Sequence, residues 1–225
     1  MLLDTVEHET GPNPQWAVLW LHGLGADGND FAPIVPELVR KDWPALRFVF
    51  PHAPVRAVTI NGGARMRAWY DIRDFDLESR ADLAGVDESI RQVDALITHE
   101  VERGIAPSRL LLAGFSQGGA ITLAAGLARQ QPLAGLIALS TYLPMPITTA
   151  QERLQPQAHT QPLFMAHGVF DPVVPPAAGE AGMQAMRRFG FEPHWRRYPM
   201  QHQVCAEEIS DLGDWMTARF AAVQG

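Results

Sequence analysis

Cysteine is almost absent from this chain of 225 residues, which contains Cys205 alone. One thiol cannot form an internal disulfide or a cysteine metal cluster, so the sequence predicts neither, and this fits a reducing compartment. Long apolar runs are also absent, because none approaches the roughly 20 residues that span a bilayer. Residues 1–7 lack the basic and apolar regions of a secretory signal. We therefore expect a cytoplasmic protein with no stable membrane insertion.

Positive charge is in the minority. The chain has 18 Lys and Arg against 25 Asp and Glu, a formal net charge of −7. Nucleic acids and anionic membranes both favour basic surfaces, so neither is expected as a partner. The hydrophobic fraction of 47% and the charged fraction of 19% are ordinary for a globular protein. The length suits one α/β domain over residues 1–225, with a core that needs no disulfide or metal.

Short apolar runs alternate with helical patterns along the chain. Strands are expected at 17–21, 46–50, 110–113, 136–140, 163–167 and 194–198, and helices at 31–41, 82–103, 117–129, 177–189 and 207–222. This alternation predicts a mostly parallel central sheet with helices on both faces. Residues 51–67 and 142–162 read as loops at strand ends, where such sheets place their ligands. No insertion is long enough for a large lid domain.

A pentapeptide at residues 114–118 stands between an apolar run and a small-residue helical run. It has the pattern G-x-S-x-G of a nucleophile elbow, which holds a serine, here Ser116, on a sharp strand-to-helix turn. Both glycines have a steric reason, because a Cβ at Gly114 or Gly118 would collide with neighbouring backbone. The alternative is a glycine-rich connection with an idle surface serine.

A serine nucleophile needs a base, and the base needs an orienting acid. After an elbow serine the acid comes next in the chain, and then the histidine. Asp171 follows a strand and fits the acid, although it could also be a turn aspartate. His194 lies within a strand pattern, whereas His202 lies in a loop before a helix. We therefore assign the base to His202, with a surface histidine as the alternative.

The negative oxygen of the tetrahedral intermediate needs two backbone N–H donors. One is expected from Gln117, directly after the serine, and the other from Leu24, in a glycine-rich loop after an early strand. That loop could also be a plain turn, but it matches neither common phosphate-binding pattern. His22 and His167 are read as structural residues at strand ends, packed near the site.

Four segments, residues 21–31, 114–119, 167–175 and 202–205, together resemble the phospholipase/carboxylesterase family of α/β-hydrolases. That family includes small bacterial carboxylesterases and the acyl-protein thioesterases. The resemblance covers nearly the whole chain and implies an α/β-hydrolase fold, a serine hydrolase and no cofactor or metal. It assigns the nucleophile to Ser116, the acid to Asp171, the base to His202 and the oxyanion amides to Leu24 and Gln117. Residues 66–71 also resemble a family motif near the substrate pocket.

The expected activity is hydrolysis of small-molecule carboxylic esters or thioesters through an acyl-enzyme. We expect short-to-medium acyl chains in a pocket lined by Leu24, Trp69, Leu143 and Met145, although Trp69 could be an ordinary packing aromatic. Lysophospholipase or acyl-protein thioesterase activity is the alternative, and a non-catalytic binding protein is a third. The residues around His202 look closer to the bacterial esterases. The resemblance also makes a homodimer possible.

Overall fold

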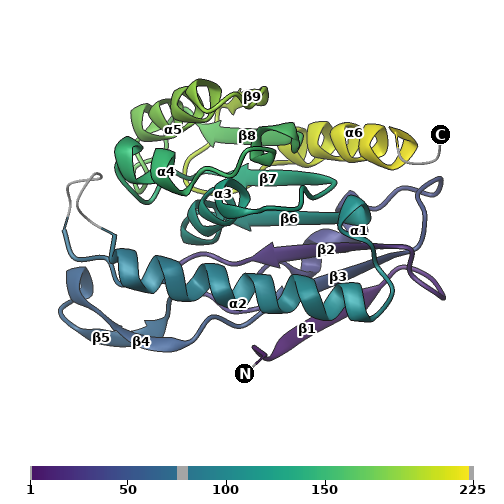
Figure 1. Ribbon diagram of the computed structural model, residues 1–225, viewed down its shortest axis with the longest axis horizontal. Helices are drawn as coiled ribbons and strands as arrows, with labels where there is room; N and C mark the ends of the chain where they lie inside the picture. Colours follow the sequence, from purple (N-terminus) through teal and green to yellow (C-terminus); the bar gives the residue numbers. More distant parts are fainter. Residues whose placement is uncertain (1, 75–80, 223–225) are drawn as a thin grey trace.

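The computed structural model describes residues 2–74 and 81–222, and within them the chain forms a seven-stranded sheet (Figure 1). Its spatial order is β1-β3-β2-β6-β7-β8-β9. These strands are Thr5–Glu9 (β1), Trp16–Leu21 (β2), Leu46–Pro51 (β3), Leu110–Phe115 (β6), Gly135–Leu139 (β7), Leu163–Gly168 (β8) and Pro193–Tyr198 (β9). Every neighbouring pair is parallel except β1 with β3. The predicted mostly parallel sheet is confirmed.

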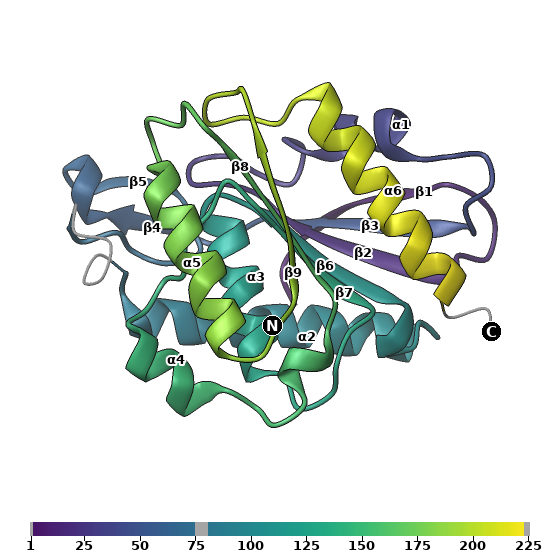
Figure 2. The ribbon, with the colours of Figure 1, turned by 90° about the horizontal axis from the view of Figure 1, so that it is seen from above.

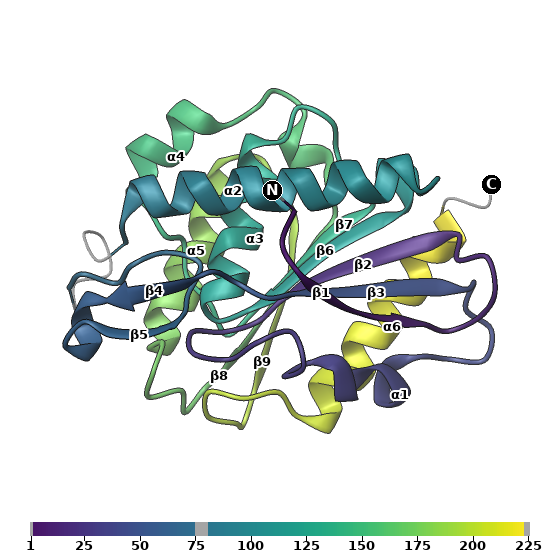
Figure 3. The same cartoon turned by 90° about the horizontal axis from the view of Figure 1, so that it is seen from below.

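Side chains that alternate along each strand build two hydrophobic layers. In β2, Ala17, Leu19 and Leu21 face one layer, and Trp16, Val18 and Trp20 face the other. The first layer is covered by α2 (Leu83–Glu102), α3 (Gln117–Ala128) and α5 (Pro176–Arg188). The second is covered by α1 (Val35–Leu38) and α6 (Ala206–Ala222). Figures 2 and 3 show these two groups on opposite faces of the sheet, as predicted.

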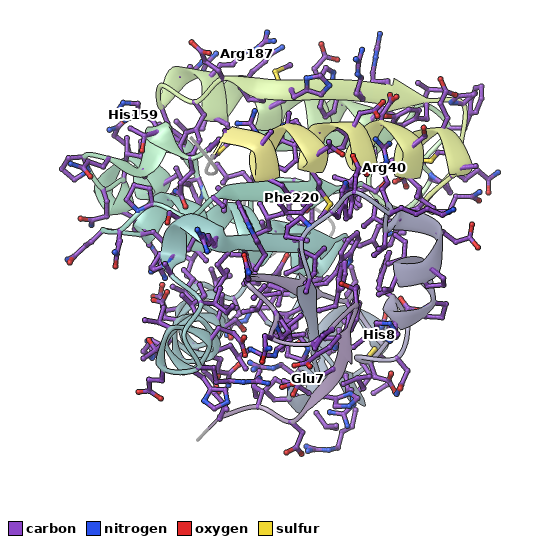
Figure 4. The ribbon with its side chains drawn as sticks, turned by 90° about the vertical axis from the view of Figure 1, so that its right-hand side faces the viewer. Glu7, His8, Arg40, His159, Arg187 and Phe220 are labelled. Carbon is purple, nitrogen blue, oxygen red and sulfur yellow. The ribbon has the colours of Figure 1, made fainter. Side chains whose placement is uncertain are left out.

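The segment after α1 also ties α6 to the sheet. Arg40 Nη1 lies 2.6 Å from Asp214 Oδ1 of α6, and Phe220 of α6 packs edge-on against Trp16 and Trp43. Figure 4 labels Arg40 beside α6 and Phe220 on it. No helix in the described part of the chain is long and apolar enough to cross a membrane.

The helix expected at 31–41 was too long. The structure has a 3₁₀ turn at Ala32–Ile34 and then the four-residue α1. Pro33 and Pro36 explain the difference, since proline suits only the first turn of a helix and disrupts its interior.

Three short strands and one short α-helix in the described part of the chain were missed. Strand β1 is polar, with its first two residues half-buried and its last three exposed, so it lacks an apolar run. The loop expected at 51–67 contains the hairpin of β4 (Val55–Val58) and β5 (Ala64–Arg67). The loop expected at 142–162 contains α4 (Ile147–Arg153). All four are only four to seven residues long, and each takes its shape from neighbours in the fold.

Candidate active site

Ser116 occupies a strained turn at the carboxyl end of β6, directly before α3. Its backbone angles are φ 54° and ψ −119°, and its N–H donates to the Leu139 carbonyl at 2.9 Å. A Cβ at Gly114 would lie 2.3 Å from the Gly118 carbonyl, and one at Gly118 would lie 2.3 Å from the Leu21 carbonyl oxygen. The sharp turn therefore requires both glycines, for the steric reason that the sequence suggested.

The structure brings Ser116, His202 and Asp171 together in one hydrogen-bonded line. His202 Nε2 lies 2.9 Å from Ser116 Oγ, and His202 Nδ1 lies 2.7 Å from Asp171 Oδ2. Ser116 and Asp171 are buried, with 9% and 4% of their surface exposed. His202 is half-buried in the loop between β9 and α6. With its Nδ1–H donated to the carboxylate, the neutral ring presents the Nε2 lone pair to the serine hydroxyl.

Asp171 is held in place by the backbone that follows it. Its Oδ1 accepts the Val173 and Val174 N–H groups at 2.8 and 2.9 Å, which leaves Oδ2 for His202. His167 also packs here, with Nε2 3.5 Å from Oδ2 and 2.9 Å from the Val174 carbonyl. Burial lowers the pKa of His167 below its usual range, which keeps the ring neutral.

Two backbone amides flank the serine. The loop after β2 approaches closely, since a Cβ at Gly23 would lie 3.5 Å from Ser116 Cβ. In the described part of the chain, the next amide, Leu24 N–H, donates to no other residue. Gln117 is the first residue of α3, and N–H groups in a first helical turn have no intrahelical acceptor. Both amides are therefore free to receive a negative oxygen.

Comparison with known proteins identifies the family of this chain. The profile of the phospholipase/carboxylesterase family matches residues 4–219. The chain belongs to the phospholipase/carboxylesterase family. The predicted α/β-hydrolase fold is confirmed, and the described residues include no large lid domain.

Several members of this family are close relatives. Acyl-protein thioesterase 1 of Neurospora crassa is 36% identical over 214 residues, which cover 92% of this chain and 87% of that protein. Carboxylesterase SOBER1 of Arabidopsis thaliana is 32% identical, with 90% of each chain covered. The crystal structure of SOBER1 matches with a TM-score of 0.86 at 31% identity, over 91% of this chain and 98% of that one.

An apolar cavity of about 290 Å³ opens between the loop after β7 and helix α5. Leu143 and Met145, which were expected to line an acyl pocket, both line this cavity. Ile147, Ala178 and Gly182 line it with them. Leu24, which is half-buried, and Trp69 do not. Trp69 is fully buried, which agrees with the alternative that it is an ordinary packing aromatic.

A second hollow, of about 430 Å³, lies on the side of His202. Phe31, Ile34, Phe115 and Val204 line it with His202 itself. The Phe115 and His202 rings are 4.8 Å apart, so the imidazole forms part of its wall. The triad therefore borders this hollow through His202.

Two polar side chains near the serine were not anticipated, those of Gln117 and Thr141, whereas His22 was expected there as a structural residue. Gln117 Oε1 accepts the Trp69 N–H at 2.8 Å, and its Nε2 donates to the Tyr70 carbonyl at 2.8 Å. Thr141 Oγ1 donates to the Ser116 carbonyl at 2.7 Å, and His22 contacts Gly23. These partners are mostly backbone atoms brought together by the fold, so no spacing in the sequence reveals them.

The described residues contain no group of three His, Cys, Asp or Glu side chains that could hold a metal ion. Cys205 is a free, partly buried thiol three residues after His202.

Proposed function

We propose that this chain is a serine esterase that hydrolyses carboxylic esters through an acyl-enzyme. The observation that carries the proposal is the continuous line from Ser116 Oγ through His202 to Asp171, beside two free backbone amides. The names carboxylesterase and acyl-protein thioesterase among its relatives support the same chemistry.

The reaction begins when Ser116 Oγ attacks the acyl carbonyl and His202 Nε2 takes its proton. Asp171 holds the imidazole in its tautomer and stabilises the imidazolium that forms. The Leu24 and Gln117 N–H groups donate to the negative oxygen. His202 then protonates the departing alcohol, leaving the acyl group on the serine. A water that gives its proton to His202 attacks this ester. The new tetrahedral intermediate then expels Ser116 Oγ, which takes the proton back from His202, and the carboxylic acid leaves.

We place the alcohol part of the substrate in one hollow and its acyl chain in the other. His202 must reach the departing oxygen, so the alcohol part occupies the hollow that His202 lines. The acyl chain occupies the cavity of Leu143 and Met145, whose volume of about 290 Å³ suits short-to-medium chains. Trp69 supports the active site indirectly, because its backbone N–H donates a hydrogen bond to the side chain of Gln117.

Thioester hydrolysis is the second candidate, because four of the relatives, at 34–36% identity, carry the name acyl-protein thioesterase 1. Lysophospholipids would use the same triad. Measuring kcat/KM for an ester, a thioester and an amide that share one acyl group ranks these activities. A non-catalytic binding protein would hydrolyse none of them.

The variant Ser116→Ala tests the proposal. Without the nucleophile, hydrolysis of p-nitrophenyl butyrate should fall by at least about 10³-fold, because the amides alone supply only a minor part of catalysis. Ser108→Ala, at an exposed serine, is the control and should keep full activity. Normal turnover by a folded Ser116→Ala protein would refute the assignment.

Three further properties stay predictions from the sequence: a single domain over residues 1–225, a cytoplasmic location and a possible homodimer. Small-molecule esters or thioesters are the proposed partners.

A further inference from the structure

The peptide between Gly23 and Leu24 is fixed through its carbonyl group. His22 Nδ1 lies 2.7 Å from the Gly23 oxygen, and the Ala26 N–H donates to the same oxygen at 3.3 Å. The described chain has no cis peptide bonds, and in a trans peptide the N–H points away from the C=O. Holding the Gly23 carbonyl therefore sets the direction of the Leu24 N–H.

The tautomer of His22 is determined by its other nitrogen. The Ala53 N–H lies 3.0 Å from His22 Nε2, and a backbone N–H can only donate. Nε2 must therefore carry the lone pair, and the neutral ring carries its proton on Nδ1 and donates it to Gly23. The ring is 1% exposed, and burial lowers its pKa below the usual range, which keeps it neutral.

The second oxyanion amide is tied to the same residue. The His22 carbonyl accepts the Trp69 indole N–H at 2.9 Å, and the Trp69 backbone N–H donates to Gln117 Oε1 at 2.8 Å. Gln117 supplies the other proposed amide. The ring of His22 thus contacts the Gly23 carbonyl. The backbone carbonyl of His22 is linked to Gln117 through Trp69.

We propose that His22 is a positioning residue that aims the Leu24 N–H at the negative oxygen of the tetrahedral intermediate. The inference rests on the proposed esterase function, since it concerns an oxyanion formed at Ser116. It differs from a packing role because it depends on one donor atom, Nδ1, and acts in the transition state.

Three variants separate the two nitrogens of the ring. Asn places an amide N–H near the position of Nδ1, so His22→Asn keeps a donor for Gly23 and loses the acceptor for Ala53. His22→Gln reaches the position of Nε2 and keeps the acceptor without the donor. His22→Phe keeps the volume of the ring and neither bond. Expression and thermal unfolding identify which variants fold.

The expected result is a lower kcat with an almost unchanged KM. His22→Gln and His22→Phe should lose about 10–100-fold in kcat, less than the about 10²–10³-fold for a missing oxyanion donor. His22→Asn should recover most of this loss. The control is His52→Phe, in the same region, where Nδ1 accepts the Gly28 N–H at 3.0 Å. It should keep kcat, because its bond does not involve the Gly23–Leu24 peptide.

A trifluoromethyl ketone gives an independent readout, because its reversible adduct with serine places an oxyanion in the same position. Its inhibition constant should rise in His22→Gln and His22→Phe by the factor that kcat falls. In the wild-type protein, nitrogen NMR should show His22 protonated on Nδ1, and the Leu24 amide resonance should shift when the ketone binds.

Unchanged kcat in folded His22→Gln and His22→Phe would overturn the inference, as would a proton on Nε2 or a Leu24 amide that does not respond to the ketone. Activity in Ser116→Ala would instead refute the esterase proposal itself, so the two failures are distinguishable.

Discussion

At the scale of single residues, the types and order of Ser116, Asp171 and His202 were enough to select them from the sequence. Each is chemically competent for its role, and the rule of chain order left few candidates. The supporting residues could not be selected in this way. His22 and Gln117 act through hydrogen bonds to backbone atoms up to 48 positions away, and only the folded chain defines those partners.

Glu208, in the first turn of α6, allows the effect of burial on the pKa of a single carboxyl group to be tested. Its side chain is 1% exposed, and burial raises its pKa from 4.5 to about 8, against the opposing effect of the Cys205 backbone N–H. Between these values the folded protein holds a proton that the unfolded chain has released. The free energy of unfolding should therefore fall as the pH rises through this window.

The variant Glu208→Gln should remove this dependence. The free energy of unfolding of Glu208→Gln minus that of the wild type should increase by about 1.4 kcal/mol per pH unit between about pH 5 and 8. Urea unfolding at both pH values measures it, with the exposed Glu207→Gln as the control. An equal pH dependence in wild type and Glu208→Gln would show that this carboxyl does not titrate as its burial requires.

At the scale of elements, the sequence predicted those whose apolar pattern is long and continuous. Strand β6 and helix α3 are buried along nearly their whole length, so their patterns predict them directly. Strand β1 is an edge strand with a polar sequence, and α1 is limited by its prolines. Pairing with β3 makes β1 a strand despite its polar sequence, and proline limits the length of α1.

The turn between β6 and α3 leads to a prediction about Gly114. An added Cβ would lie 2.3 Å from the Gly118 carbonyl, which belongs to α3 and cannot move without displacing the helix. Gly114→Ala should therefore destabilise the protein by about 1–3 kcal/mol or more, and it should lower kcat because Gln117 shifts with α3. Thermal unfolding and esterase assays measure both effects.

The stability control is Gly182→Ala in α5, where the nearest atom to an added Cβ is 3.4 Å away, an ordinary contact. This variant should keep or slightly increase stability, since alanine favours helix more than glycine. Equal unfolding temperatures for Gly114→Ala and wild type would contradict the steric account of the elbow.

At the scale of the whole molecule, the site exists only because the parallel strands end at one edge of the sheet. Leu24, Ser116, Asp171 and His202 follow β2, β6, β8 and β9. Ser116 and His202 are 86 positions apart in the chain and 2.9 Å apart in space. The nucleophile should therefore be reactive in the folded chain and ordinary in the unfolded chain.

Labelling with a fluorophosphonate tests this claim most directly. The folded wild-type protein should gain one phosphonyl group, located on Ser116 by peptide mass spectrometry, because an ordinary serine does not react. Labelling should disappear in urea, where His202 and the amides no longer surround the hydroxyl. No adduct on the folded protein, or an adduct on a different residue, would contradict the proposed triad.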